Sequence, residues 1–296
     1  MPIRYDMPLW RPPSEGHNLI VQATIGCSYN HCSFCSMYTS KRFHPRPLED
    51  VRRDIDQGAR DWPQADRVFL ADGDALVLPT DHLYRILDHL RTRLPHLARV
   101  SSYATPDNIN RKSVEELAGL KARKLSLVYL GIESGHADVL KRITKGASPG
   151  GITRAIQRAT AAGLKVSCMV ILGLGGRVYS HPHIAATARL VNAAPPTYLS
   201  TLQLDLERAE APGFLPRWEK HGARFEPLND AECLDEMARL VADLDPPRPV
   251  IFRSNHASNA LPLGGTLPRD KESLLAAITL AREAGQGMRP RFLRGY

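Results

Sequence analysis

Three cysteines of the chain lie within nine residues, where Cys27, Cys32 and Cys35 follow the spacing C-x4-C-x2-C. Three thiolates on one loop can bind three irons of a four-iron cluster and leave the fourth iron without a protein ligand. An iron with an open position is suited to catalysis, whereas a closed four-cysteine site is typical of electron transfer or structural support. Gly26, directly before the first cysteine, allows the backbone to turn sharply into the loop. The segment therefore favours a catalytic iron–sulfur cluster.

Two other interpretations of this loop stay open. Three cysteines and one histidine, here His31 or His44, are a known ligand set for structural zinc, and the thiols could also be unrelated to one another. The chain has five cysteines, an odd number that argues against a disulfide framework and suits a reduced compartment. Cys168 and Cys233 lie in apolar patterns, where we expect them to be core residues.

The elements that would position this loop follow a regular pattern. Short apolar runs alternate with longer amphipathic stretches, which is typical of βα units around a parallel sheet. Strands are expected at residues 19–24, 67–71, 100–103, 124–131, 165–172 and 198–206. Thr80 is expected to cap one of the intervening helices, and Ser113 with Glu116 forms a capping box before another. The prediction is an α/β fold, namely a partial (β/α)6 TIM-like barrel.

The chain is expected to contain three parts. Residues 1–18 form an N-terminal extension, residues 19–210 form the barrel, and the proline-rich residues 211–296 form a C-terminal α/β or helical cap. At 296 residues, a barrel with one such appendage is a reasonable size.

Polar and glycine-rich segments follow several of the predicted strands, at the barrel face where functional residues gather. Asp72 and Asp74 flank Gly73 after the second strand and could accept hydrogen bonds from an ammonium group, although an ordinary Asp-Gly turn has the same pattern. Glu133 follows the fourth strand within Gly-Ile-Glu-Ser-Gly, and its carboxylate could accept from two neighbouring hydroxyls. Two further segments are Leu140–Gly146, which contains Lys145, and the turn at 170–176, which contains Gly173.

Together these segments resemble the radical S-adenosylmethionine (SAM) superfamily. Its commonest motif is C-x3-C-x2-C with an aromatic residue between the last two cysteines, as Phe34 is here. This chain has one more residue between Cys27 and Cys32, so it departs from the best-known subfamilies. The resemblance implies a [4Fe-4S] cluster bound by Cys27, Cys32 and Cys35, with SAM as the second cofactor.

The resemblance also implies which residues contact SAM. The turn of Asp72, Gly73 and Asp74 matches the family segment that binds the SAM amino group. Glu133 matches the glutamate that binds the ribose hydroxyls, and Lys145 matches a basic residue that meets the SAM carboxylate. The latter position could also be an ordinary solvated lysine at a helix end. Gly173 lies in a turn similar to the adenine-binding turn, although Arg177 and Val178 replace the acidic residue often found just beyond it.

The chemistry implied by the resemblance is reductive cleavage of SAM. The product would be a 5′-deoxyadenosyl radical that abstracts hydrogen from a small or medium-sized metabolite, in an oxidoreductase or transferase reaction. An external electron donor of the flavodoxin or ferredoxin type is required. Such acidic proteins suit the formal net charge of +8, as an anionic substrate would.

The substrate itself is the least determined part of the prediction. Arg253 could bind an anionic group and His256 could transfer a proton, in a polar segment that could equally be a structural loop. A haem-binding carrier related to coproporphyrinogen oxidases and an RNA-modifying enzyme stay open as alternatives. The sequence contains no long apolar segment typical of a membrane span or secretory signal, so we expect a cytoplasmic protein that needs no membrane.

Overall fold

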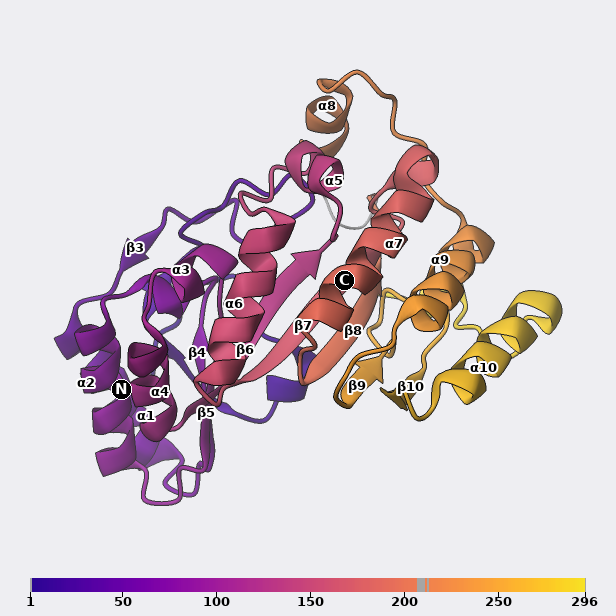
Figure 1. Ribbon diagram of the computed structural model, residues 1–296. Coiled ribbons are helices and arrows are strands. Elements are labelled where there is room, and N and C mark those ends of the chain that lie inside the picture. Colours follow the sequence, from indigo (N-terminus) through magenta and orange to yellow (C-terminus); the bar gives the residue numbers. More distant parts are fainter. Residues whose placement is uncertain (1, 207–210, 212, 296) are drawn as a thin grey trace. The chain divides into compact units, whose positions relative to one another are not determined.

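The computed structural model describes residues 2–206, 211 and 213–295. Eight strands form one sheet in the order β1-β4-β5-β6-β7-β8-β9-β10 (Figure 1). Their bounds are Leu19–Gln22 (β1), Arg67–Ala71 (β4), Arg99–Tyr103 (β5), Leu125–Glu133 (β6), Lys165–Leu172 (β7), Tyr198–Gln203 (β8), Val250–Arg253 (β9) and Gly264–Leu267 (β10). The sheet is mostly parallel, and β10 pairs with β9 in the antiparallel direction. This α/β arrangement confirms the predicted partial TIM-like fold.

Ten α-helices are found in the described part of the chain. They are Leu48–Asp61 (α1), Thr80–Arg93 (α2), Pro106–Asn110 (α3), Val114–Ala122 (α4), Ala137–Arg142 (α5), Pro149–Ala161 (α6), Gly176–Ala193 (α7), Phe214–Glu219 (α8), Asp230–Asp243 (α9) and Lys271–Ala284 (α10). The capping box of Ser113 and Glu116 before α4 is confirmed. The prediction that Thr80 caps α2 is wrong, because Pro79 occupies the N-cap and Thr80 is already helical.

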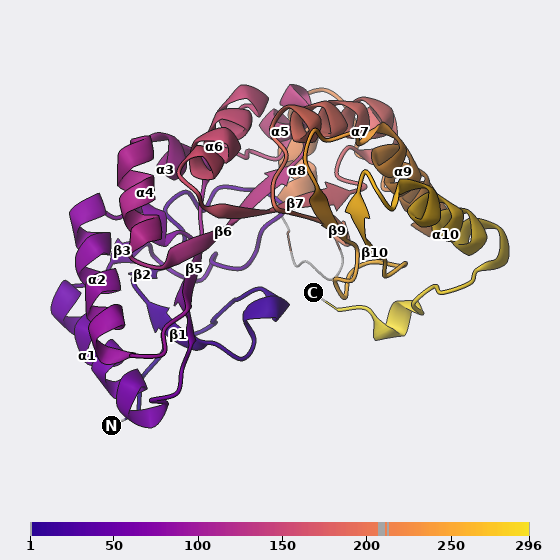
Figure 2. The same ribbon diagram turned by 60° about the horizontal axis from the view of Figure 1, so that its bottom comes forward.

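The chain divides into two compact units, and the strands β6 and β7 have residues in both. The first unit comprises Met1–Asn30, Met37–Leu130 and Gln157–Val166. In it, α1 packs on β1 and α2, and α2 packs on α4 (Figure 2). The apolar face of α2 is fully buried at Leu83, Ile86, Leu87 and Leu90, a spacing that fits one side of a helix.

The second unit comprises His31–Ser36, Gly131–Ile156 and Ser167–Tyr296. In it, α7 packs on α9, and α10 packs on both α9 and β10. The predicted C-terminal cap thus contributes β9 and β10 to the main sheet, since β9 pairs in parallel with β8. The predicted boundary at residue 210 lies outside the described residues. None of the helices in the described part of the chain is long and apolar enough to cross a bilayer.

The N-terminal extension contacts strands β5 and β6 in the first unit. Glu15 is fully buried in a 3-10 helix at Pro13–Glu15 and accepts hydrogen bonds from Arg99 at 3.0 and 3.1 Å. The hydroxyl of Tyr129 also donates to Glu15. Arg99 is the first residue of β5, so this ion pair lies at the end of the strand away from the segments that follow β4 and β5.

Candidate functional site

The cysteine loop is flanked by two short strands that pair with each other. Strands β2 (Thr24–Ile25) and β3 (His44–Pro45) pair in antiparallel fashion, and the segment between them contains Cys27, Cys32 and Cys35. These cysteines are partly exposed, and no disulfide involves any of the five. Cys168 and Cys233 are buried, as expected for core residues. Within the described ranges, no three Cys, His, Asp or Glu side chains converge on a point that could hold a single metal ion.

In the first unit, Asp72 follows β4 and is completely buried. Its Oδ2 accepts from the Gly26 amide at 2.7 Å and from Lys41 Nζ at 2.9 Å. Its Oδ1 accepts from Gln22 Nε2 at 3.3 Å. Three donors from the protein thus surround the carboxylate, and two of them come from the residues that flank the cysteine loop.

Gly73 lies directly against the first cysteine. Its amide donates to the Gly26 carbonyl at 3.0 Å. A Cβ at position 73 would approach the Cβ of Cys27 to 2.5 Å and its Sγ to 3.1 Å, which no side chain could tolerate without a shift of the backbone. Glycine is therefore needed here for close contact between the β4 turn and the cysteine loop.

Asp74 is also fully buried, but its two oxygens differ. Oδ2 accepts from the Ser28 hydroxyl and from Asn108 Nδ2, at 2.5 Å from the latter. Oδ1 has no hydrogen-bond partner within the described part of the chain. Burial raises the pKa of Asp74 to about 6, against the opposing effect of the hydrogen bonds from Ser28 and Asn108. Asn108 is held in α3, whose N-cap is Thr105. A buried acceptor that lacks a partner suits an ammonium ligand.

In the second unit, Glu133 and Lys145 form an ion pair of 2.8 Å, with side chains that are 10% and 12% exposed. Glu133 is the last residue of β6 and has a left-handed φ of 60°. Burial alone would lower the pKa of the Lys145 ammonium. Glu133 and the nearby Cys32 and Cys35 outweigh burial, and the pKa lies above its ordinary value. The structure thus pairs Glu133 with Lys145, and the charge of Lys145 interacts with two of the three cysteines.

The turn that carries Glu133 is fixed by a buried histidine that the sequence did not indicate. His183 of α7 is fully buried, and burial lowers its pKa to about 4, so the ring is neutral at pH 7. With Nε2–H donating to the Ile171 carbonyl at 3.1 Å, Nδ1 accepts from the Ser134 hydroxyl at 2.8 Å. The Gly135 amide donates to Thr187 at 2.8 Å. The ends of β6 and β7 are therefore joined through α7.

The turn after β7 is held by a second residue that sequence reasoning missed. Gly173 has a φ of 79°, and its amide donates to Glu236 Oε2 at 2.6 Å. Glu236 belongs to α9 and is fully buried, which raises the pKa of its carboxyl to about 7. The available signal was its spacing, because Glu236 lies between Cys233 and Leu240 on the apolar face of the helix.

The two candidate substrate residues make their hydrogen bonds within the C-terminal segment. Arg253 ends β9, is exposed, and donates through Nη1 to the Phe252 carbonyl at 2.8 Å. His256 Nδ1 lies 2.8 Å from the Ser258 hydroxyl, and burial followed by the charge of Arg289 lowers the pKa of His256. A structural loop makes contacts of this kind. The catalytic roles of Arg253 and His256 stay predictions. Phe34 is partly exposed in the cysteine loop.

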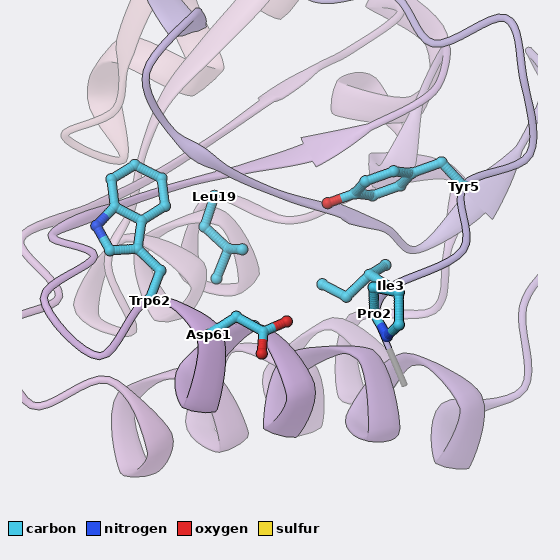
Figure 3. A pocket seen from close by; sticks show the side chains of 7 residues that line it. Pro2, Ile3, Tyr5, Leu19, Asp61 and Trp62 are labelled. Carbon is cyan, nitrogen blue, oxygen red and sulfur yellow. The ribbon is translucent and has the colours of Figure 1, made fainter.

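A cavity of about 280 Å³ in the first unit contains none of the predicted site residues (Figure 3). Its wall is mostly apolar, with Asp61 at one side and the Tyr5 hydroxyl donating to the Ile20 carbonyl at 3.0 Å. The lining residues are Pro2, Ile3, Tyr5, Leu19, Gly58, Asp61 and Trp62. The cavity reaches the first residue of β1, whereas the cysteine loop follows that strand.

A mostly parallel TIM-like sheet with a cysteine loop after its first strand and buried carboxylates at the ends of β4 and β6 defines a class of cofactor-dependent α/β enzymes. The family model of the Radical SAM superfamily matches residues 21–189, which is more than half of the chain. The chain belongs to the radical SAM superfamily and is an enzyme of that class. The superfamily uses a [4Fe-4S] cluster and SAM. No curated protein matches the chain.

Several solved structures share the fold. Coproporphyrinogen III oxidase from Escherichia coli, a radical SAM enzyme, is 17% identical with a TM-score of 0.56, over 76% of this chain and 51% of that one. The radical SAM methyltransferase TsrM from Kitasatospora setae, with cobalamin and a [4Fe-4S] cluster bound, is 17% identical with a TM-score of 0.56, over 90% and 61%. Methylornithine synthase is 13% identical with a TM-score of 0.52, over 88% and 68%. The chain thus spans about half to two thirds of the length of these proteins.

The residues of the chain fit the cluster and SAM. The three cysteines supply the thiolates that iron prefers, and Gly73 permits the close contact between the β4 turn and Cys27. Asp74 Oδ1 is a buried acceptor without a partner in the described ranges. The positive charge of Lys145 lies where it can offset the charge of the thiolates of Cys32 and Cys35.

Proposed function

We propose that the chain binds a [4Fe-4S] cluster through Cys27, Cys32 and Cys35 and cleaves SAM reductively. When bound, these cofactors supply a 5′-deoxyadenosyl radical that abstracts hydrogen from a small or medium-sized metabolite. The chain's own residues bind and orient SAM and exclude water from it. The donor of the required electron would be a flavodoxin or ferredoxin, whose acidic surface complements the net charge of +8.

The observation that carries this proposal is the Glu133–Lys145 ion pair, in which the charge of Lys145 also interacts with Cys32 and Cys35. A SAM molecule offers hydroxyls on its ribose and a carboxylate on its methionine part. Glu133 would accept from the ribose hydroxyls, and Lys145 would donate to the carboxylate. With Nζ and Oε1 only 2.8 Å apart, both groups can serve one ligand that is itself bound next to the cysteines. The Ser134–His183 hydrogen bond would keep the Glu133 turn in place during binding.

Asp74 would bind the ammonium group of SAM through Oδ1. Its Oδ2 is already held by Ser28 and Asn108, so the free oxygen has a fixed direction and loses little conformational entropy on binding. Gly73 would allow the close approach that this contact needs. The turn at Gly173 would meet the adenine, and Phe34 would pack beside the cluster. Neither the haem carrier nor the RNA-modifying enzyme is favoured by a contact in the described ranges.

The test is anaerobic reconstitution with iron and sulfide, followed by dithionite and SAM. About four irons per chain and formation of 5′-deoxyadenosine are expected. Binding of one zinc in place of iron would refute the proposal. A cluster without cleavage would be followed by an equilibrium SAM titration of the reduced protein. Absence of SAM binding would then also count against it.

A further inference from the structure

A buried ion pair connects the two residues that flank the cysteine loop. Lys41 Nζ lies 2.9 Å from Asp72 Oδ2, and the two side chains are 2% and 0% exposed. Lys41 also donates to the Asp6 carbonyl at 2.7 Å and lies 3.4 Å from the Asp6 carboxylate. The same Asp72 oxygen accepts the Gly26 amide at 2.7 Å. One carboxylate oxygen therefore holds a group from each side of the loop.

The position of these contacts along the chain is specific. Gly26 directly precedes Cys27, and Lys41 follows Cys35 by six residues. All three cysteines thus lie in the stretch between the two residues that share Asp72 Oδ2. Fixing the ends of a flexible loop lowers the entropy that the loop must lose when it binds a ligand. A loop held in this way is better prepared to bind a cluster.

Stability of the fold alone does not account for this pair. Burying two opposite charges carries a large desolvation cost, and a packed apolar pair of similar volume often gives equal or greater stability. Asp72 also adopts a left-handed φ of 65°, which is uncommon for a residue other than glycine. Three protein donors already occupy most of the acceptor sites of its carboxylate, which is completely buried.

We propose that Asp72 and Lys41 are positioning residues that clamp the ends of the cysteine loop, and that Asp74 alone meets the SAM ammonium. This inference rests on the proposed function, because the loop is clamped for cluster binding. It gives Asp72 a different role from the ammonium contact expected from the sequence. Asp72 then holds the two ends of the loop. Asp74 accepts from Ser28 within the loop through Oδ2 and meets the ligand through Oδ1.

The test uses three clamp variants, namely Asp72→Asn, Lys41→Met and the double variant of these two. Arg99→Met serves as the control. The Asp72→Asn variant would keep an acceptor for the Gly26 amide but remove the charge. Arg99→Met breaks the Glu15–Arg99 pair, which has a fully buried carboxylate in the same unit but lies at the start of β5. The first measurement is hydrogen–deuterium exchange of the iron-free chain, in peptides covering residues 24–41 and 99–103. The second is the rate at which the reconstituted chain loses iron to a chelator.

In each single clamp variant, we expect the 24–41 peptide to exchange about tenfold faster and the cluster to lose iron about tenfold faster, because the loop opens more readily. The acceleration in the double variant should be smaller than the product of the two single accelerations, because Asp72 and Lys41 contact each other. Arg99→Met should instead accelerate exchange at 99–103. If Arg99→Met accelerates exchange in the 24–41 peptide as much as Asp72→Asn and Lys41→Met do, the clamp is refuted. It is also refuted if Asp72→Asn weakens SAM binding while exchange and iron loss stay normal.

Failure of the proposed function gives a different result. If the wild-type chain binds no cluster, the exchange experiment on the iron-free chain still compares the two pairs. Faster exchange confined to the 24–41 peptide would then support the clamp, and unchanged exchange would overturn it. The Asp74→Asn variant completes the comparison. Its carboxamide oxygen can still accept from Ser28 in the loop, so it should weaken SAM binding while leaving exchange at 24–41 near that of the wild type.

Discussion

A methyl group added at Gly131 tests the Glu133–Lys145 pair without altering either residue. Gly131 lies within β6, and its φ is outside the left-handed region, so the backbone accepts alanine. A Cβ built at this position lies 1.8 Å from Glu133 Oε1 and 2.8 Å from Lys145 Nζ. The Gly131→Ala variant therefore places an atom where the carboxylate is.

The size of the effect follows from these distances. Real Cβ contacts are essentially never shorter than 3.0 Å, so the carboxylate oxygen must move by about 1.2 Å. The end of a glutamate side chain can move that far at small cost to folding, since the neighbouring backbone is not displaced. Misplacement of a positioned group by about 1 Å can lower a rate by about 100-fold. We expect SAM cleavage to fall by about this factor, while the melting temperature changes little.

The assay is 5′-deoxyadenosine formation by the reconstituted variant, together with a SAM binding titration and a thermal melt. Gly150→Ala is the matched control, because the nearest atom to its Cβ would be Arg154 Nη1 at 3.6 Å, an ordinary contact. The control should keep full activity. If Gly131→Ala binds and cleaves SAM within about threefold of the control, the Glu133 carboxylate is not a SAM contact, and its proposed role is refuted.

Three further predictions concern single side chains. Cys32→Ala should abolish SAM cleavage and lower the iron content, whereas Cys233→Ala should retain iron; an active Cys32→Ala chain would remove Cys32 from the ligand set. Glu133→Gln should weaken SAM binding about tenfold with an unchanged cluster spectrum, since one carboxylate acceptor becomes a donor; equal affinity would exclude the ribose contact. Glu236 has its folded-state pKa raised from 4.5 to about 7 by burial, opposed by the Gly173 amide, Ser180 and Arg239. The folded chain thus binds more protons, and stability should fall by up to about 3 kcal/mol as pH rises from about 4.5 to 7. Glu236→Gln should remove this decline in urea unfolding, and an unchanged pH profile would contradict the assignment.

Most strands could be predicted from the sequence because their apolar runs are bounded by turns. The predicted strands at 67–71 and 165–172 have the bounds of β4 and β7, and the predicted strand at 198–206 extends past the end of β8 at Gln203. Strand β10 was missed, because Gly264–Leu267 has two glycines and no alternation. Its pairing depends on β9, which lies more than ten residues away, and local patterns carry no such information.

The candidate site was predictable only where its residues form contiguous motifs. The cysteine spacing and the Gly-Ile-Glu-Ser-Gly segment are visible in the sequence, and the resemblance indicated Lys145 as a residue that meets the SAM carboxylate. Lys41 and His183 could not be found in this way. Their partners are Asp72 and Ser134, which lie 31 and 49 positions away along the chain. A buried lysine or histidine has no periodic signature, so only the folded arrangement reveals what it contacts.

The carboxylates of Asp72, just after β4, and Glu133, at the end of β6, belong to residues with an unusual backbone conformation. Asp72 and Glu133 have φ values of 65° and 60°, which cost free energy in residues with a Cβ. Glycine at either position would relieve the strain but would remove the carboxylate. The contacts of the carboxylate must therefore offset the cost of the conformation. The Asp72 carboxylate contacts Gly26 and Lys41, and the Glu133 carboxylate contacts Lys145. Asparagine tolerates the left-handed region as well as aspartate does. The Asp72→Asn variant therefore changes charge with little change in backbone strain, which makes it the cleanest probe of why a charged residue occupies this turn.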